Sequence, residues 1–282
     1  MTYSPGAAPG TGKIPKPATN RFGAPSDAPR IPSDHRARHV AATEKIASRA
    51  KKEIVRSKNF AVSALMPDGE VRKFTYTAAS PEFLENICAR FGRGTLIDTD
   101  SGPTAVEDLQ PGTQVRTKDN GWQTLKWIGS CSCDGSDFKD EDRLPLRIKA
   151  DALGQLRPEH DLLVTPGFRV LLNHPNCAAL FDTAETLASA IDLIDSSSIL
   201  RLRPRGTLWF YNLMFDAHQI IKVNGLESES FHPGNFGVNV LGSDELFQMR
   251  QIFPHLRGDL GGFGRTARPI LRNFESEILK VG

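Results

Sequence analysis

The sequence contains few cysteines, four in 282 residues, and no apolar run near the roughly 20 residues that a membrane span needs. Four cysteines in a chain of this length are too few for a disulfide scaffold, so a reducing compartment is expected. The first thirty residues also lack the continuous apolar stretch of a secretory signal peptide. These absences predict a soluble protein, cytoplasmic by default, while export by a route without a signal peptide stays open.

Patterns of several enzyme and cofactor classes are missing as well. The chain has no G-x-S-x-G, so a Ser-His-Asp hydrolase is not indicated, and the glycine-rich run 261–265 lacks the Gly-Lys-Ser/Thr of a phosphate loop. Soft metal ligands occur in two places, Cys131 with Cys133 and His174 with Cys177. Four such ligands could hold zinc, but C-x-C is tighter than the spacing that zinc sites use. The sequence favours unligated thiols in two exposed loops and predicts no cofactor and no metal.

Charge is unevenly distributed, although the net charge is only +2. Residues 1–58 hold 12 Lys and Arg against 4 Asp and Glu, which leaves 23 against 29 of the totals of 35 and 33 for the remainder. Seven of the 19 prolines fall in residues 1–38, and residues 39–57 have helical spacing. We expect residues 1–57 to be a disordered basic arm. It could contact nucleic acid or another anionic surface, but without interleaved aromatic side chains a solvated spacer is favoured.

The stretch 90–129 has the pattern of short strands joined by tight turns. The expected elements are a strand at 95–99, one turn at 106–109, a reversal at 111–112, a strand through 115–117, a hairpin turn at 119–121 and a strand at 122–128. Pro-Gly and Asp-Asn-Gly supply the backbone conformations that such reversals need. This pattern predicts a compact, all-β opening to the domain.

The rest of the chain continues the β pattern with a few helices. Strands are expected at 60–77 as a hairpin and at 144–149, 162–172, 199–203, 207–215 and 219–223, and helices at 81–91, 182–194 and 243–253. The helix at 182–194 is indicated by a capping box of Asp182 and Glu185. We therefore expect a mainly β protein, in which residues 58–89 form a lead-in hairpin and short helix, residues 90–254 the β domain with a terminal helix, and residues 255–282 a flexible tail.

Three groups of motifs carry a family resemblance. Within residues 90–129 stand G-T-x-I, V-E-D-L-x-P-G, V-x-T-x-D-N-G and W-I-G; DLLVTPGFRVL follows at 161–171 and YNLMFDAHQIIKVNGL at 211–226. In this order they resemble the Hint module, the fold shared by Hedgehog autoprocessing domains and inteins, in its bacterial form. The resemblance spans roughly residues 90–235 and implies a twisted, two-lobed β fold.

The resemblance also implies a site for self-cleavage. Active members attack their own backbone with a Cys or Ser, while a Thr-x-x-His holds the scissile peptide and protonates the leaving amine. Here Arg90 stands at the position of the nucleophile and Phe168 at that of the histidine. A guanidinium stays protonated and cannot attack a carbonyl, and phenylalanine transfers no proton. Thr165 and His218, the histidine of the late motif, are retained.

Two hypotheses follow for the function. In the first, cleavage has been lost and the domain serves as a binding or structural module for a protein partner that the sequence does not identify. In the second, the chain still cleaves itself by an N–S acyl shift, with Cys88 as nucleophile, Thr165 polarising the amide and His218 donating the proton. Cys88 lies two residues, roughly 7 Å of extended chain, from the expected position, against about 3 Å for attack. We therefore favour a packing role for Cys88 and a backbone hydrogen bond for His218.

Overall fold

The computed structural model describes residues 57–78, 82–233, 242–256, 263–272 and 275, which belong to one compact unit, Val55–Gly282. The predicted basic arm and its helix at 39–57 lie outside the described residues, apart from Ser57. Within the described part, no helix is both long and apolar enough to cross a membrane.

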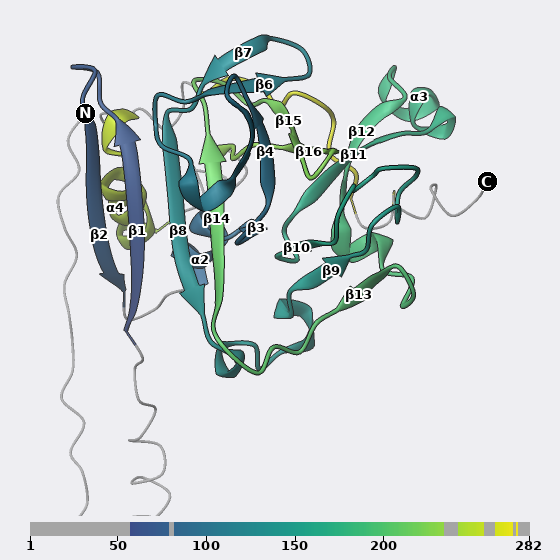
Figure 1. Cartoon of the computed structure of the whole chain (residues 1–282), viewed down its shortest axis with the longest axis horizontal. Coiled ribbons are helices and arrows are strands. Elements are labelled where there is room, and N and C mark those ends of the chain that lie inside the picture. Colours follow the sequence, from purple (N-terminus) through teal and green to yellow (C-terminus); the bar gives the residue numbers. More distant parts are fainter. Residues whose placement is uncertain (1–56, 79–81, 234–241, 257–262, 273–274, 276–282) are drawn as a thin grey trace, which may run out of the picture. The chain divides into compact units, whose positions relative to one another are not determined.

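Two antiparallel sheets make up most of the fold, so the predicted fold class, mainly β, is confirmed (Figure 1). The first sheet contains, in spatial order, β13 (Ile199–Arg201), β9 (Leu146–Ile148), β10 (Leu162–Val164), β3 (Phe91–Gly92), β14 (Leu208–Met214), β8 (Trp127–Cys133), β1 (Lys58–Leu65) and β2 (Val71–Ala78). The second contains β12 (Glu185–Ser189), β11 (Arg169–Asn173), β16 (Leu226–Glu229), β15 (Ile220–Val223), β4 (Leu96–Thr99), β6 (Gln114–Thr117) and β7 (Gly121–Thr124), with β5 (Gly102–Ala105) paired to β4.

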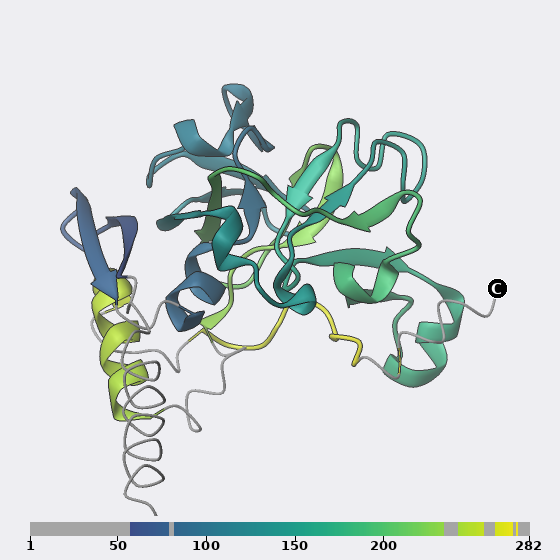
Figure 2. The ribbon, with the colours of Figure 1, turned by 90° about the horizontal axis from the view of Figure 1, so that it is seen from below.

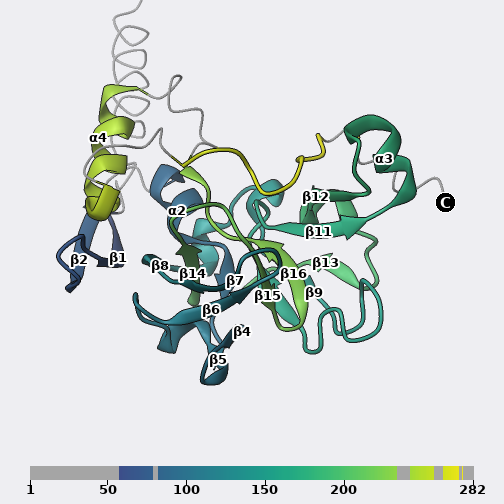
Figure 3. The same cartoon turned by 90° about the horizontal axis from the view of Figure 1, so that it is seen from above.

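In the described residues, helices are few and short. They are α2 (Glu82–Cys88), α3 (Pro175–Phe181) and α4 (Ser243–Ile252), together with the single turns η1 (Val106–Asp108), η2 (Gly135–Asp137), η3 (Glu141–Arg143), η4 (Ala190–Leu193) and η6 (Pro254–Leu256). The helix α3 lies at one end of the β11–β12 pair (Figure 3). His174 caps its N-terminus by accepting the N–H of Asn176, and Pro175 occupies the first helical position, where a missing N–H costs nothing.

The lead-in hairpin β1–β2 is continuous with the sheet of the β domain. β1 pairs with β8 over Phe60–Ala64, with Val62 opposite Gly129. The helix α4 lies against this hairpin (Figure 2), where Tyr76 Oη donates to the Gln251 carbonyl at 2.5 Å. On the same side, the indole N–H of Trp127 donates to the Ile252 carbonyl at 2.7 Å. Residues on either side of the β domain in sequence therefore pack together on one edge of it.

Two predicted elements were wrong. The expected strand at 122–128 is two strands, because the chain leaves the second sheet after β7 and enters the first at β8, with the buried Leu125 at the crossing. The expected helix at 182–194 is the strand β12 followed by the turn η4. Asp182 ends α3 in the left-handed conformation, with φ 56°, and does not begin a helix. Both faces of β12 are buried, so no strand alternation appears in its sequence.

Part of the segment predicted to be a flexible tail contacts the sheets. In residues 263–272, Phe263 and Leu271 are buried, and Leu271 donates its N–H to the Leu187 carbonyl at 2.9 Å. Arg268 forms ion pairs with Glu185 and Asp119 at 2.7 Å each. This segment therefore covers the end of the second sheet.

His255 in η6 provides a measurable acid sensitivity. Burial lowers the pKa of His255 to about 4, with the charge of Asp216 opposing this shift and that of Lys126 adding to it. Neither ring nitrogen has a hydrogen-bond partner among the described residues. The folded state holds this ring neutral, so the unfolded state takes up the proton first as the pH falls below about 6.5. We expect the stability tied to His255 to be present above that pH and lost between about 6.5 and 4. His255→Phe should recover roughly 1–2 kcal/mol of unfolding free energy at the acidic end, after allowance for partial exposure.

The measurement is urea unfolding at several pH values. His160→Phe, at an exposed position, is the matched control for adding a phenyl ring. Equal pH profiles for the wild type and His255→Phe would contradict the assignment.

Candidate functional site

The peptide bond that the resemblance marks for cleavage, Ala89–Arg90, lies just before the two-residue strand β3. β3 lies between β10 and β14, with Phe91 opposite Val164 on one side and Tyr211 on the other. Just before it, Arg90 donates its N–H to the Tyr211 carbonyl at 3.0 Å, and Thr165 donates its N–H to the Arg90 carbonyl at 3.1 Å. The peptide between Ala89 and Arg90 is thus held between two neighbouring strands.

Thr165 contacts this peptide with its side chain as well. Its hydroxyl Oγ1 donates to the carbonyl of Ala89 at 3.1 Å, the carbonyl that a nucleophile at position 90 would attack. A hydrogen bond to that oxygen stabilises the negative charge that develops when a carbonyl is attacked. The structure therefore brings Thr165 and Arg90 together at the Ala89–Arg90 peptide.

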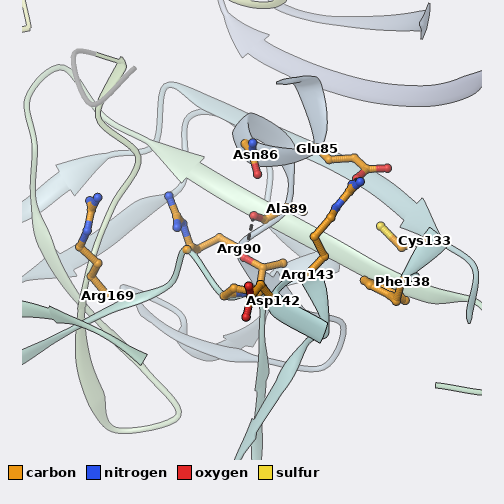
Figure 4. Close-up of a pocket in the computed structure, with 12 residues that line it drawn as sticks. Glu85, Asn86, Ala89, Arg90, Cys133, Phe138, Asp142, Arg143 and Arg169 are labelled. Atoms are coloured by element: carbon orange, nitrogen blue, oxygen red, sulfur yellow. Dashed lines mark hydrogen bonds and ion pairs between the residues drawn. The ribbon is translucent and has the colours of Figure 1, made fainter. Parts of the chain in front are cut away.

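The side chain of Arg90 is buried, with 8% of the residue exposed, and it lines a cavity of about 260 Å³ (Figure 4). Burial lowers its pKa to about 10, opposed by the charge of Glu229 and reinforced by that of Arg169. At this value the guanidinium is still a cation at neutral pH. A Cβ atom on Gly167 would lie 2.7 Å from its Nη1 atom, so the glycine leaves the space that the guanidinium occupies.

Glu229 is the buried counter-charge behind this cavity, with 1% of the residue exposed. Its Oε1 accepts from Arg169 Nη1 at 2.8 Å, and its Oε2 lies 3.4 Å from His218 Nε2. Burial alone would raise its pKa, but the contact with His218 and the charges of Arg169 and Arg90 hold the pKa of Glu229 below its usual value. It is therefore an anion at neutral pH.

His218 is fixed by backbone groups at both ring nitrogens. Nδ1 accepts the N–H of Ala267 at 2.9 Å, so the ring proton resides on Nε2. Nε2 lies 3.1 Å from the Ser230 carbonyl, to which it donates; the Glu229 contact is a longer, less directed one. The favoured interpretation of His218, a backbone hydrogen bond, matches this geometry. A ring bound in this way does not present a free proton to the Ala89–Arg90 peptide.

Phe168 lies on the core side of the same turn. It is fully buried, and its ring meets that of Phe91 edge-on with the centroids 5.9 Å apart. Its backbone N–H donates to the Thr165 carbonyl at 3.0 Å, which closes the Pro166–Gly167 turn. The side chain at position 168 contributes packing in place of a proton-transfer group.

Cys88 ends α2 and is fully buried in the core of the first sheet. Burial raises the pKa of its thiol, which keeps it protonated and poorly nucleophilic. A Cβ atom on Gly129 would lie 3.0 Å from its Sγ, so the thiol packs directly on the β8 backbone. It faces the apolar cluster around Trp127 and Phe210, whereas the cavity is lined by the next two residues, Ala89 and Arg90.

A comparison with protein families identifies the domain. A sequence profile described as "Hint domain" matches residues 88–235, more than half of the chain. The chain belongs to the Hint domain family. The predicted family is thereby confirmed, and the match contains Arg90, Thr165, Phe168 and His218. Among curated proteins, no match to the chain was found.

A second polar cluster lies at the other end of the cavity in the Hint domain. The ammonium of Lys58 donates to Glu85 Oε1 at 2.6 Å, to Cys133 Sγ at 3.0 Å and to Asp137 Oδ2 at 3.1 Å. A hydrogen bond from Cys131 and the charge of Lys58 lower the pKa of the Cys133 thiol against the opposing effect of burial. The three acceptor atoms lie within 4.8 Å of one another, as metal ligands would, but the protein's own ammonium occupies the position between them.

The four ligands considered for zinc do not converge. Cys131 and Cys133 are buried on β8 of the first sheet, and Cys177 is buried in α3 beside the second. Nδ1 of His174 accepts a backbone N–H, and the Cys177 thiol accepts from Thr186 Oγ1 at 3.4 Å. The prediction that these thiols lie in exposed loops was wrong, because β8 extends to Cys133 and α3 packs its cysteine inward.

Sequence reasoning missed Arg169, Glu229 and Lys58 as parts of this region. Arg169 directly follows Phe168 and points back toward the cavity from β11. Glu229 ends β16, where the alternation Leu226-Glu227-Ser228-Glu229 suggests an exposed acid in a half-buried strand. Lys58 falls at the end of a basic run that gave no sign of burial. The sequence contained one sign that Glu229 is buried: two residues after it stands the apolar Phe231.

Glu229→Gln tests the buried ion cluster of the Hint domain. The substitution keeps the shape but leaves Arg169 and Arg90 without their anion, so we expect a loss of about 3–5 kcal/mol of unfolding free energy at pH 7. Because the folded pKa is lowered, the stability from Glu229 is present above the unfolded pKa of about 4.3 and lost as the pH falls. The difference between wild type and variant, measured by urea unfolding, should therefore shrink toward acidic pH.

Glu227→Gln is the matched control on the same strand. Glu227 pairs with Lys118 at the surface, where an ion pair contributes no more than about 1 kcal/mol. Equal losses in the two variants would show that Glu229 is not the stabilising anion.

Proposed function

We propose that this Hint domain does not cleave its own chain and serves as a binding module. The observation that carries the proposal is the side chain at the position of attack. Arg90 places a buried cation next to the Ala89 carbonyl, and a guanidinium that is protonated at neutral pH has no lone pair with which to attack.

The remaining parts of the site support loss of the reaction with retention of the scaffold. The Thr165 hydroxyl still donates a hydrogen bond to the Ala89 carbonyl, so this peptide remains bound in the site. Proton donation to the leaving amine has no candidate at position 168, and His218 is bound at both nitrogens. A polarised carbonyl without a nucleophile or an acid is stable, because the acyl shift needs all three.

The alternative is self-cleavage that begins at Cys88. Its thiol is buried, carries a raised pKa and packs against Gly129 and Trp127 in an apolar core. Attack by a thiol requires a thiolate about 3 Å from the carbonyl carbon. This environment disfavours the thiolate, which supports the packing role.

Intact mass spectrometry of the purified full chain tests the proposal. We expect the mass to remain at 31.0 kDa after prolonged incubation with a thiol reductant or hydroxylamine, both of which release an ester or thioester. Fragments that end at residue 87, from attack by Cys88, or at residue 89, from attack at position 90, would contradict the proposal.

Cys88→Ala separates the two hypotheses. If Cys88 only packs, the variant loses about 1–2 kcal/mol of stability and its mass behaviour equals that of the wild type. If Cys88 is the nucleophile, any cleavage seen in the wild type disappears in Cys88→Ala. Cys177→Ala, at another buried cysteine, is the matched control.

The double variant Arg90→Cys with Phe168→His tests whether the scaffold still supports the reaction. The new thiol can form a thioester with Ala89 as the amide bond breaks, and the new imidazole can give the amine its proton. We expect hydroxylamine to release residues 1–89 from the double variant, with a slower release from Arg90→Cys alone. The same double variant carrying Thr165→Val should be slower by about 10²-fold, since it lacks the bond to the carbonyl oxygen.

A further inference from the structure

Arg90 is a buried cation whose guanidinium has no partner in the part of the chain that the structure describes. With 8% of the residue exposed, its guanidinium makes no hydrogen bond or ion pair to another residue in the described part of the chain. A buried charge normally has such a partner, because leaving it without one costs several kcal/mol. The guanidinium can find a hydrogen-bonding partner only in the cavity of about 260 Å³ that it lines.

A second guanidinium lies beside it. Arg169 lines the same cavity from β11, and in Figure 4 both guanidinium groups extend in the same direction, away from Cys133. The repulsion between them contributes to the lowered pKa of Arg90. Glu229 offsets part of this charge, but one of its oxygens is bound to Arg169 and the other faces His218. Two cations therefore share one anion, and this end of the cavity keeps a net positive charge.

The geometry points to an oxyanion site in this cavity, in which Arg90, assisted by Arg169, binds the carboxylate or phosphate group of a small ligand. This inference names the ligand chemistry of the binding module and so rests on the proposed function. Guanidinium groups bind both anions through paired N–H donors, which suits Arg90 because no described residue accepts from its guanidinium. The cavity is smaller than most sites for drug-sized ligands, so the ligand is an anion of few atoms or the anionic end of a larger molecule.

Most of the other walls agree with this chemistry, although the lining also contains the carboxylate of Asp142, which pairs with Arg201 Nη2 at 3.5 Å. Ala89, Pro166 and Phe138 line the cavity with apolar surface, which lowers the local dielectric and strengthens a charged hydrogen bond. Arg143, the third arginine of the lining, is already paired with Glu85 and Glu82 and adds no free donor. Arg90 is thus the only arginine of this lining that has no partner among the described residues.

Arginine side-chain NMR on the full chain tests the site. The probes are inorganic phosphate and acetate, each titrated at constant ionic strength against chloride, and the readout is the Nε–Hε signals of Arg90 and Arg169. We expect saturable shifts of both signals with at least one of the two oxyanions and none with chloride. The better of the two probes tells whether the natural group is a phosphate or a carboxylate.

Variants decide whether Arg90 is responsible. Arg90→Gln should weaken binding, read from the Arg169 signal, by about tenfold or more, because it removes a charged donor pair. Arg90→Lys keeps the charge without the paired donors, so its affinity should lie between those of the wild type and Arg90→Gln. Arg93→Gln, at an exposed position three residues away, should bind as the wild type does. Circular dichroism spectra equal to that of the wild type verify that each variant is folded.

Three results would overturn the inference: no saturable shift with either oxyanion, equal shifts with chloride, or affinity unchanged in a folded Arg90→Gln. Intact masses recorded on the same samples keep this test separate from that of the proposed function. Cleavage would appear in the mass, whereas a failed titration of an uncleaved chain would refute the anion site alone.

Discussion

The hydrogen bonds that hold β3 between β10 and β14 determine the rest of the site. This strand has only two residues, yet it joins the two halves of the first sheet. The bonds at Arg90 that precede it, to Tyr211 and from Thr165, fix the Ala89–Arg90 peptide with both sides of the backbone engaged. Because the backbone is fixed there, the side chain of residue 90 has a single direction available, into the cavity. The resemblance places the attacking nucleophile at position 90. With arginine there, the same position instead directs a positive charge into the cavity.

Charge burial in this domain takes two different forms. At one end of the cavity, Lys58 is surrounded by Glu85, Asp137 and Cys133, so that its charge is compensated by direct contacts. At the other end, the Arg90 guanidinium forms no hydrogen bond or ion pair with any described residue and is stabilised by the charge of Glu229. In both clusters the buried charge carries a desolvation cost. Among the described residues, only the Arg90 cluster leaves N–H donors available to a ligand. At one end of the cavity the cation is therefore paired by side chains of the described protein, and at the other end it can pair with a ligand.

Much of the fold was accessible from sequence because turns and strand alternation are local. The segment 90–129 shows this, since its Pro-Gly and Asp-Asn-Gly turns specify where the chain reverses. The two failures have different causes: β12 is buried on both faces and gave no alternation, whereas the strand at 122–128 gave no sign of passing from one sheet to the other. For the site, Arg90, Thr165 and Phe168 follow from the motif order. Arg169, Glu229 and Lys58 depend on contacts between strands distant in sequence, which no local pattern encodes.

The hairpin β1–β2 and the helix α4 lie outside the stretch that matches the family, residues 88–235, yet both complete its first sheet. β8 would lose its partner strand and become an open edge if the chain were cut at those boundaries. Trp127, fully buried in the intact chain, would lose the Ile252 carbonyl and the ring of Phe253, whose centroid lies 4.9 Å away. Open edges and bared aromatic surface promote association between chains. The part of this chain suited to separate study therefore extends beyond the family match at both ends, from the start of β1 through α4 and Phe253 to the segment 263–272 that contacts the second sheet.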